Sequence, residues 1–120
     1  MGKIKNTFEF PWPPRALSPN CAMKWQAKAG PRREYKEIWR SQSFMLGVRP
    51  EGNVKLNIVF HPPNNLKRDL DNMLASIKLG LDGLAQGLNI NDFTFRPITI
   101  DVGETVKGGN VVVTVEYDQS

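Results

Sequence analysis

The feature that most constrains the fold is a change of hydrophobic period near the middle of the chain. Residues 54–60 place apolar side chains at every second position, which is the period of a β-strand with one buried face. After the sequence HPPNN at 61–65, apolar residues recur at helical spacing from Leu70 to Leu88. The change predicts a strand, a proline-rich connection and one long amphipathic helix. Its expected buried stripe is Leu70, Met73, Leu74, Ile77, Leu81, Leu84 and Leu88.

The first half of the chain predicts one more strand and one more helix. Ile4–Phe10 resembles a strand, and the prolines of PWPP at 11–14 end it because proline donates no ladder hydrogen bond. Residues 15–30 look irregular, and Gly30-Pro31 is expected to open a helix. Helical spacing relates Tyr35, Ile38, Trp39, Gln42, Met45 and Leu46, so four or five apolar side chains are expected to share one stripe.

The last third predicts two strands. Phe93–Val102 changes face at Pro97, which indicates a bulge or an edge strand. The turn KGGN at 107–110 then leads to a final alternating strand that ends near Tyr117. The order β-α-β-α-β-β predicts an α+β fold with one mixed sheet of about four strands, which includes a hairpin and is covered by two main helices.

Length and composition favour one compact domain over residues 1–120. No apolar segment is long enough to span a bilayer, and the N-terminus does not resemble a signal peptide. The single cysteine, Cys21, can form neither an internal disulfide nor a zinc cluster. We therefore expect a cytoplasmic protein with no membrane partner. The sequence contains no P-loop, and we expect no organic cofactor.

Basic residues outnumber acidic residues by 16 to 12, and their distribution is uneven. The third of the chain between Arg15 and Arg49 is strongly basic and contains only two acidic residues, Glu34 and Glu37. A polyanionic partner is plausible for this segment. Trp25 lies within it and is expected either to stack on a base or to pack in a core or an interface. The expected phosphate-binding residues here are Lys24, Lys28, Arg32 and Arg33.

Two aspartates flank the predicted start of the long helix. Asp69 in a structural role would be the N-cap, and Asp71 in the first turn would be favoured by the helix dipole. At a strand-to-helix junction the two carboxylates can also converge on one point. Mg²⁺ prefers such oxygen ligands, so Asp69 and Asp71 are also candidate metal ligands.

Two further residues are candidates for the same site. Asp92 follows the long helix, and it would reach Asp69 and Asp71 if the next strand lay beside residues 54–60; otherwise it is a turn residue. Lys78 shares the helical face of Asp71 and could offset phosphate charge, or it could be a solvated lysine. Neither residue has a local motif that decides between its two roles.

Several short motifs together resemble the RusA family of Holliday junction resolvases. They are FPWPP at 10–14, RDLDN at 68–72, NDFTF at 91–95 and VKGGNVVVTV at 106–115, and they span nearly the whole chain. The resemblance implies a homodimeric, Mg²⁺-dependent endonuclease that cuts two opposed strands of a four-way junction. Carried over by motif, the metal ligands fall on Asp69, Asp71 and Asp92, and the preceding arginine is Arg68.

The chain departs from the family pattern at two positions. Ala75 stands where the family commonly has a lysine, and Lys78 is expected to supply that charge. Asn91 and Asp92 stand where the family has an acidic pair. We expect catalysis by Asp69, Asp71, Asp92 and Lys78, with Lys67 and Arg68 among the residues that bind DNA. The alternatives are a non-catalytic protein that binds branched DNA and a module that binds RNA.

Overall fold

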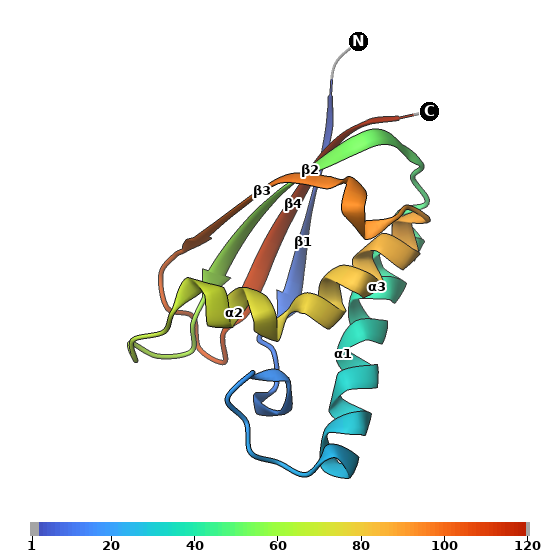
Figure 1. Cartoon of the computed structure of the whole chain (residues 1–120). Helices are drawn as coiled ribbons and strands as arrows, with labels where there is room; N and C mark the ends of the chain where they lie inside the picture. The colour runs from blue at the N-terminus through green and yellow to red at the C-terminus, as the bar shows by residue number, and fades with distance from the viewer. Residues whose placement is uncertain (1–2, 120) are drawn as a thin grey trace.

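The computed structural model describes residues 3–119. It has the α+β architecture that the sequence predicts, with a mixed sheet and helices on one of its faces (Figure 1). The helix and strand order is confirmed, except that the second predicted helix is two helices. In chain order the elements are β1 (Ile4–Pro11), the 3-10 turn η1 (Arg15–Leu17), α1 (Trp25–Leu46), β2 (Pro50–His61), α2 (Leu70–Ser76), α3 (Lys78–Leu88), the 3-10 turn η2 (Asp92–Thr94), β3 (Phe95–Val102) and β4 (Asn110–Gln119).

The four strands of the sheet are arranged in the order β1-β4-β2-β3. β4 is antiparallel to both of its neighbours, whereas β2 and β3 are parallel. The predicted hairpin is therefore wrong, because β2 separates β3 from β4. Burial fits the central place of β4, because all four of its inward apolar residues are fully buried: Val111, Val113, Val115 and Tyr117.

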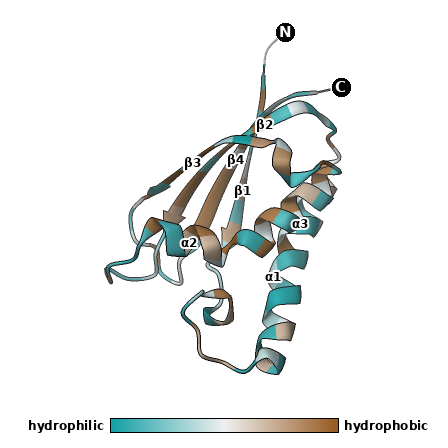
Figure 2. Cartoon of the chain, viewed as in Figure 1, coloured by the Kyte–Doolittle hydropathy of each residue, from teal (hydrophilic) through white to brown (hydrophobic). Residues whose placement is uncertain are grey.

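The core lies between the sheet and the pair formed by α1 and α3. Phe10 of β1 stacks on Trp39 of α1, with ring centroids 3.9 Å apart. The central strands are predominantly hydrophobic in Figure 2, whereas α1 is largely hydrophilic along its length. The opposite face of the sheet is polar: the Thr99 hydroxyl donates a hydrogen bond of 2.6 Å to Asn57 across β3 and β2. No helix in residues 3–119 is long and apolar enough to cross a membrane.

Helix α1 begins at Trp25, so the predicted start at Gly30-Pro31 is wrong. Pro31 lies inside the helix instead. The buried residues of α1, which are Tyr35, Trp39 and Ser43, follow a spacing of four. The prediction that Met45 belongs to the buried stripe is also wrong, since Met45 is 83% exposed. Met45 lies two residues beyond Ser43, so its side chain points roughly 200° around the helix from that of Ser43.

The predicted long helix is divided at Ile77, a fully buried residue whose φ and ψ are −105° and 8°. Leu70 is 37% exposed, so its predicted place in the buried stripe is wrong. After the break, α3 packs very closely against α1. A side chain at Gly83 would overlap the backbone carbonyl of Lys36, so only glycine allows this approach.

The predicted irregularity at Pro97 is confirmed in both of its forms. β3 is an edge strand, and its register with β2 shifts between the pairs Val54–Phe95 and Leu56–Ile98. Two residues of β3 therefore face one residue of β2, which is a bulge. Phe93, predicted to open the strand, lies in η2 instead.

Candidate functional site

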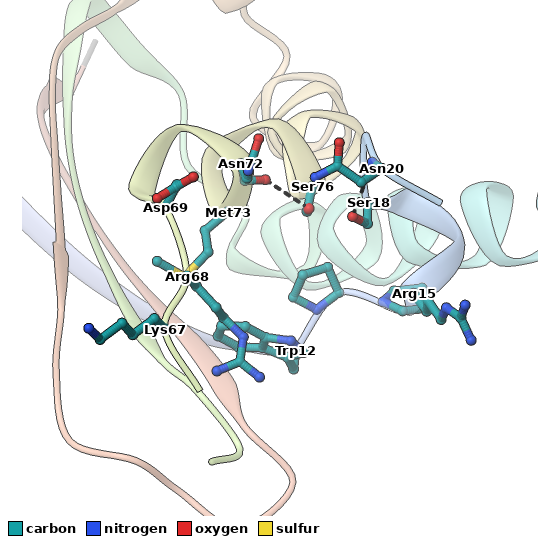
Figure 3. Close-up of a pocket in the computed structure, with 12 residues that line it drawn as sticks. Trp12, Arg15, Ser18, Asn20, Lys67, Arg68, Asp69, Asn72, Met73 and Ser76 are labelled. Carbon is teal, nitrogen blue, oxygen red and sulfur yellow. Dashed lines mark hydrogen bonds between the residues drawn. The ribbon is translucent and has the colours of Figure 1, made fainter. Parts of the chain in front are cut away.

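A hollow of about 350 Å³ lies between the segment that follows β1 and the segment that enters α2. Figure 3 shows the two segments facing each other across it. They meet because β1 and β2 finish at the same end of the sheet: Pro11 and His61 both pair with Asn110 of β4. The charged residues of the lining are Arg15, Lys67, Arg68 and Asp69. The hollow therefore has three cations and one carboxylate.

The wall that follows β1 is held by buried anchors. The prolines after Trp12 end the strand, and η1 then buries Ala16 and Leu17. The Tyr35 hydroxyl of α1 donates a hydrogen bond of 2.8 Å to the carbonyl of Pro11. Burial raises the pKa of Tyr35 well above its usual value, so this phenol stays protonated as a donor. The end of β1 is thereby tied to α1.

Arg68 joins the two walls. Its guanidinium lies over the Trp12 ring, 5.5 Å from the centroid, a cation–π arrangement. The same group donates hydrogen bonds to the Asn64 side-chain oxygen at 2.9 Å and to the Leu66 carbonyl at 3.1 Å. Arg68 was predicted to bind DNA, and the structure gives it a second role as a brace of residues 64–68.

Asp69 and Asp71 lie at the start of α2, as predicted. Asp69 holds the N-cap position with extended backbone angles, but its side chain makes no cap hydrogen bond. Asp69 therefore takes the N-cap position through its backbone conformation alone, and its carboxylate does not contribute to the cap. Asp71 accepts a hydrogen bond of 3.0 Å from the N–H of Asn72. Both residues are exposed, so both carboxylates are accessible to a ligand from solvent.

Asp92 lies far from this pair, and its predicted reach to Asp69 and Asp71 within one chain is wrong. The condition set by the sequence is met, since β3 does lie beside β2. The two strands are parallel, however, so the start of β3 lies near the start of β2, where Phe95 pairs with Val54. Asp92 lies just before β3, whereas Asp69 and Asp71 follow the other end of β2. The distance from Val54 to His61 is roughly 23 Å of strand. Within residues 3–119, no three acidic, histidine or cysteine side chains form a metal-binding group.

Lys78 lies beyond the break at Ile77, as the first residue of α3. It lines a separate hollow with Arg32 and Asp82, and this second hollow shares only Ser76 with the first. The structure does not bring Lys78 into the hollow that Asp69 lines. Its catalytic role stays a prediction.

The predicted basic surface is found at the start of α1. Trp25 is 67% exposed, so the alternative that it packs in the core of this chain is wrong. The Arg32 guanidinium lies 5.3 Å from the Trp25 ring centroid. Lys28 donates a hydrogen bond of 2.9 Å to the carbonyl of Cys21, while Lys24 and Arg33 are exposed.

Sequence reasoning missed the polar lining of the hollow. Asn72 lies inside the RDLDN motif and Ser76 lies one helical turn after it, which is a signal that could have found both. Asn20 and Ser18 lie in a segment that looked irregular, and nothing local singles them out. Trp12 was noted only as part of PWPP.

These features define a class of protein: a small α+β domain with a charged hollow at one end of a mixed sheet and two accessible carboxylates beside it. No protein-family model matches the chain. An uncharacterized protein of Xylella fastidiosa (strain Temecula1 / ATCC 700964) is 35% identical over 118 residues. The match covers 94% of this chain and 77% of the Xylella protein. The chain belongs to the same family as that protein.

Proposed function

We propose that the chain is a Mg²⁺-dependent DNA endonuclease that resolves four-way junctions by paired symmetric nicks in recombination and repair. The proposal starts from the resemblance of its motifs to the RusA family. The observation that carries it is the state of Asp69, which holds a cap position without using its carboxylate to cap. Since a cap hydrogen bond stabilises a helix by about 1 kcal/mol, leaving it unmade favours another use of this side chain.

The residues at the start of α2 fit a Mg²⁺ ion. Mg²⁺ is usually bound through one or two carboxylates, with water and phosphate oxygens as the other ligands. Asp69 and Asp71 are two apart, exposed and without an ion-pair partner among residues 3–119. They would hold the ion, which supplies Lewis-acid activation of water and of the scissile phosphate when bound.

The cations of the hollow fit the polyanionic substrate. Arg15 and Lys67 are exposed and would bind DNA phosphates on either side of the cleaved bond, a positioning role. The surface around Trp25 at the start of α1 would bind a more distant DNA arm. A cytoplasmic location, where DNA with such junctions would be met, belongs to the same proposal.

We further propose that the active form is a homodimer built on the exposed edge of β3. Ile98 and Val102 are exposed apolar residues on this edge, and Leu70 is exposed on α2, which contacts β3. An edge strand presents unpaired backbone groups that a second copy can pair with. Two-fold symmetry makes that pairing antiparallel, with the helices of both copies on the same face.

This dimer would change the place of Asp92. Antiparallel pairing sets the start of one β3 beside the end of the other. Asp92, which lies just before β3, would then approach the end of the partner's sheet, where Lys67, Arg68 and the metal-binding aspartates lie. Its negative charge complements those two cations. The third ligand implied by the resemblance would thus come from the second subunit.

The chief rival is a protein that binds branched DNA or RNA without cutting it. The exposed Trp25 with Arg32 stacked on it favours binding of single-stranded nucleic acid. Incubation with an end-labelled four-way junction, in Mg²⁺ and in EDTA, separates the two functions. We expect paired nicks in Mg²⁺ and intact bound junction in EDTA. Binding without nicks in Mg²⁺ would identify the rival.

A further inference from the structure

We infer that the hollow between Trp12 and α2 holds one unpaired nucleobase of the branched DNA, next to the phosphate that reaches Asp69. The inference rests on the proposed function and adds how the protein distinguishes a branch from a duplex. A base in continuous duplex is stacked and paired. A base at a branch point is unstacked at lower cost than a base inside a duplex, so branched DNA offers it to a pocket more readily.

The hollow has the size and the surfaces that a base requires. Its volume of about 350 Å³ lies within the range of small-ligand pockets, which is roughly 300–1,000 Å³. The Trp12 ring and the Arg68 guanidinium, which form a cation–π pair, supply planar surfaces, and such aromatic or guanidinium planes are the usual stacking partners of unpaired bases. Pro13 and Met73 add apolar surface to the lining.

Free amide groups in the hollow can read the edge of a base. Asn72 and Asn20 both line it (Figure 3), and neither side-chain amide makes a hydrogen bond within residues 3–119. Each amide offers two donors and one acceptor, the complement of a Watson–Crick edge. The Ser76 hydroxyl is already committed as a donor to the Asn72 carbonyl at 2.9 Å, which leaves it as an acceptor.

The charges of the hollow set the direction of the bound nucleotide. Arg15 and Lys67 are exposed on the lining of the hollow, so the phosphates of the DNA backbone would pass beside these two cations. Asp69 lies on the same lining and at the start of α2. A base held between Trp12 and Asn72 therefore keeps its own phosphate close to the proposed cleavage site.

The test is an abasic scan combined with a pocket variant. Four-way junctions with one abasic residue at each position around the branch are titrated in EDTA, with affinity measured by fluorescence anisotropy. The proteins are wild type, Asn72→Ala and the control Asn53→Ala. Asn53 is an exposed asparagine near the start of β2, at the other end of the sheet. Alanine at 72 keeps the helix, because it is a strong helix former and the amide it removes has no hydrogen-bond partner in the described part of the chain, residues 3–119.

We expect one abasic position to weaken wild-type binding by about ten-fold, as for loss of one stacked base. Asn72→Ala should weaken binding to the intact junction and should lose less affinity at that abasic position than wild type does, because only the stacking on Trp12 and Arg68 remains to be lost. Asn53→Ala should behave as wild type. Cleavage in Mg²⁺ is measured on the same junctions, so that failure of the nuclease proposal is seen separately.

Three results would overturn the inference. An affinity that is equal at all abasic positions, in a protein that cuts the intact junction, removes the base pocket and leaves the nuclease. If Asn72→Ala lowers the affinity for the intact and the abasic junction by the same factor relative to wild type, the hollow binds backbone phosphate and not a base. No binding to any junction removes both proposals. Position-dependent binding without cleavage keeps the pocket and removes the nuclease.

Discussion

The guanidinium of Arg68 lies 5.5 Å from the centroid of the Trp12 ring, so two short motifs far apart in sequence touch each other directly. Trp12 and the two prolines after it line one wall of the hollow, and Arg68, Asp69 and Asn72 of RDLDN line the other. The interaction explains why the two motifs belong together in one chain. It also fixes the approach to α2, because the same guanidinium holds Asn64 and Leu66.

Arg68→Lys should therefore destabilise the protein despite keeping the charge. Lysine cannot lie flat on Trp12 while it makes the fork of hydrogen bonds to residues 64–66. We expect the free energy of unfolding in urea to fall by about 1 to 2 kcal/mol. Arg33→Lys, at an exposed position of α1, is the control and should leave the urea midpoint unchanged. Equal midpoints for both variants would show that Arg68 is not a brace.

Asp69→Asn and Asp71→Asn should abolish cleavage and leave the fold intact. Neither carboxylate supports the helix by a cap bond, and an asparagine oxygen at 71 can still accept the N–H of Asn72. We expect nicking to fall by a factor on the order of 10² or more, as for loss of a charge-stabilising group. Junction affinity in EDTA should stay equal or rise, since a negative charge near phosphate is removed. Asp118→Asn is the matched control.

A further substitution of Asp69 distinguishes the two roles of this residue. Because asparagine caps a helix as well as aspartate does, the variant that separates them is Asp69→Ala: a cap hydrogen bond predicts a loss of about 1 kcal/mol of stability, whereas the structure predicts an unchanged thermal midpoint. Collapse of the fold in Asp69→Asn, or nicking at the wild-type rate in Asp71→Asn, would contradict the metal site.

Mixed dimers test whether Asp92 acts across the subunit interface. Asp69→Asn and Asp92→Asn subunits carry different affinity tags, are co-expressed and are purified as the mixed dimer. One site of that dimer then carries both substitutions and the other carries none. We expect each homodimer to be inactive and the mixed dimer to nick one strand of a junction without resolving it. A mixed dimer without any nicking contradicts the interface, and full activity of Asp92→Asn excludes Asp92 as a ligand.

The basic surface at the start of α1 should contribute to affinity without distinguishing duplex from branched DNA. Lys24→Ala combined with Arg33→Ala should weaken binding to duplex and branched DNA alike. The slope of log affinity against log salt should fall by roughly 0.9 for each DNA phosphate that the variant no longer neutralises. Lys5→Ala with Lys55→Ala, on the polar face of the sheet, is the control. An unchanged slope in the first double variant would move the DNA surface elsewhere.

Tyr35→Phe should make the protein less sensitive to alkali. Burial raises the folded-state pKa of Tyr35 above that of the unfolded chain, so the phenol ionises more readily on unfolding. Stability from this group is complete below the unfolded pKa of about 10 and is lost as pH rises toward the folded value. Phenylalanine removes this decline but also the bond to Pro11, at a cost of about 1 kcal/mol near neutral pH. Urea unfolding at pH 8 and pH 11 measures both effects, and a parallel decline in both proteins would contradict them.

The strands were predictable because alternation is a local property of the sequence. β2 and β4 carry apolar residues at every second position, and both are strands with fully buried inner faces. Alternation does not say which strands pair. The central place of β4 depends on packing between segments far apart, and KGGN looks the same in a hairpin as in the longer return across β2.

The site was predictable in its parts and not in its assembly. Asp69 and Asp71 follow from RDLDN, whereas the distant place of Asp92 follows from parallel pairing of β2 and β3. A strand-helix-strand unit with parallel strands already implies that the next strand starts away from the end of the previous one. The break at Ile77 has no proline or glycine at the break itself, so the continuous apolar stripe concealed it.

The break at Ile77 divides the molecule into parts that can change independently. Gly83 locks α3 to α1, so substitutions there are restricted by the close approach of the two backbones. The short helix α2 is joined to that pair through Ile77, and it contributes Met73 to the core while most of its other residues are exposed or half-buried. Substitutions at its exposed positions can therefore be accepted without repacking the core. Over evolution, a scaffold of this kind could keep its shape while the chemistry at residues 69–76 diverged.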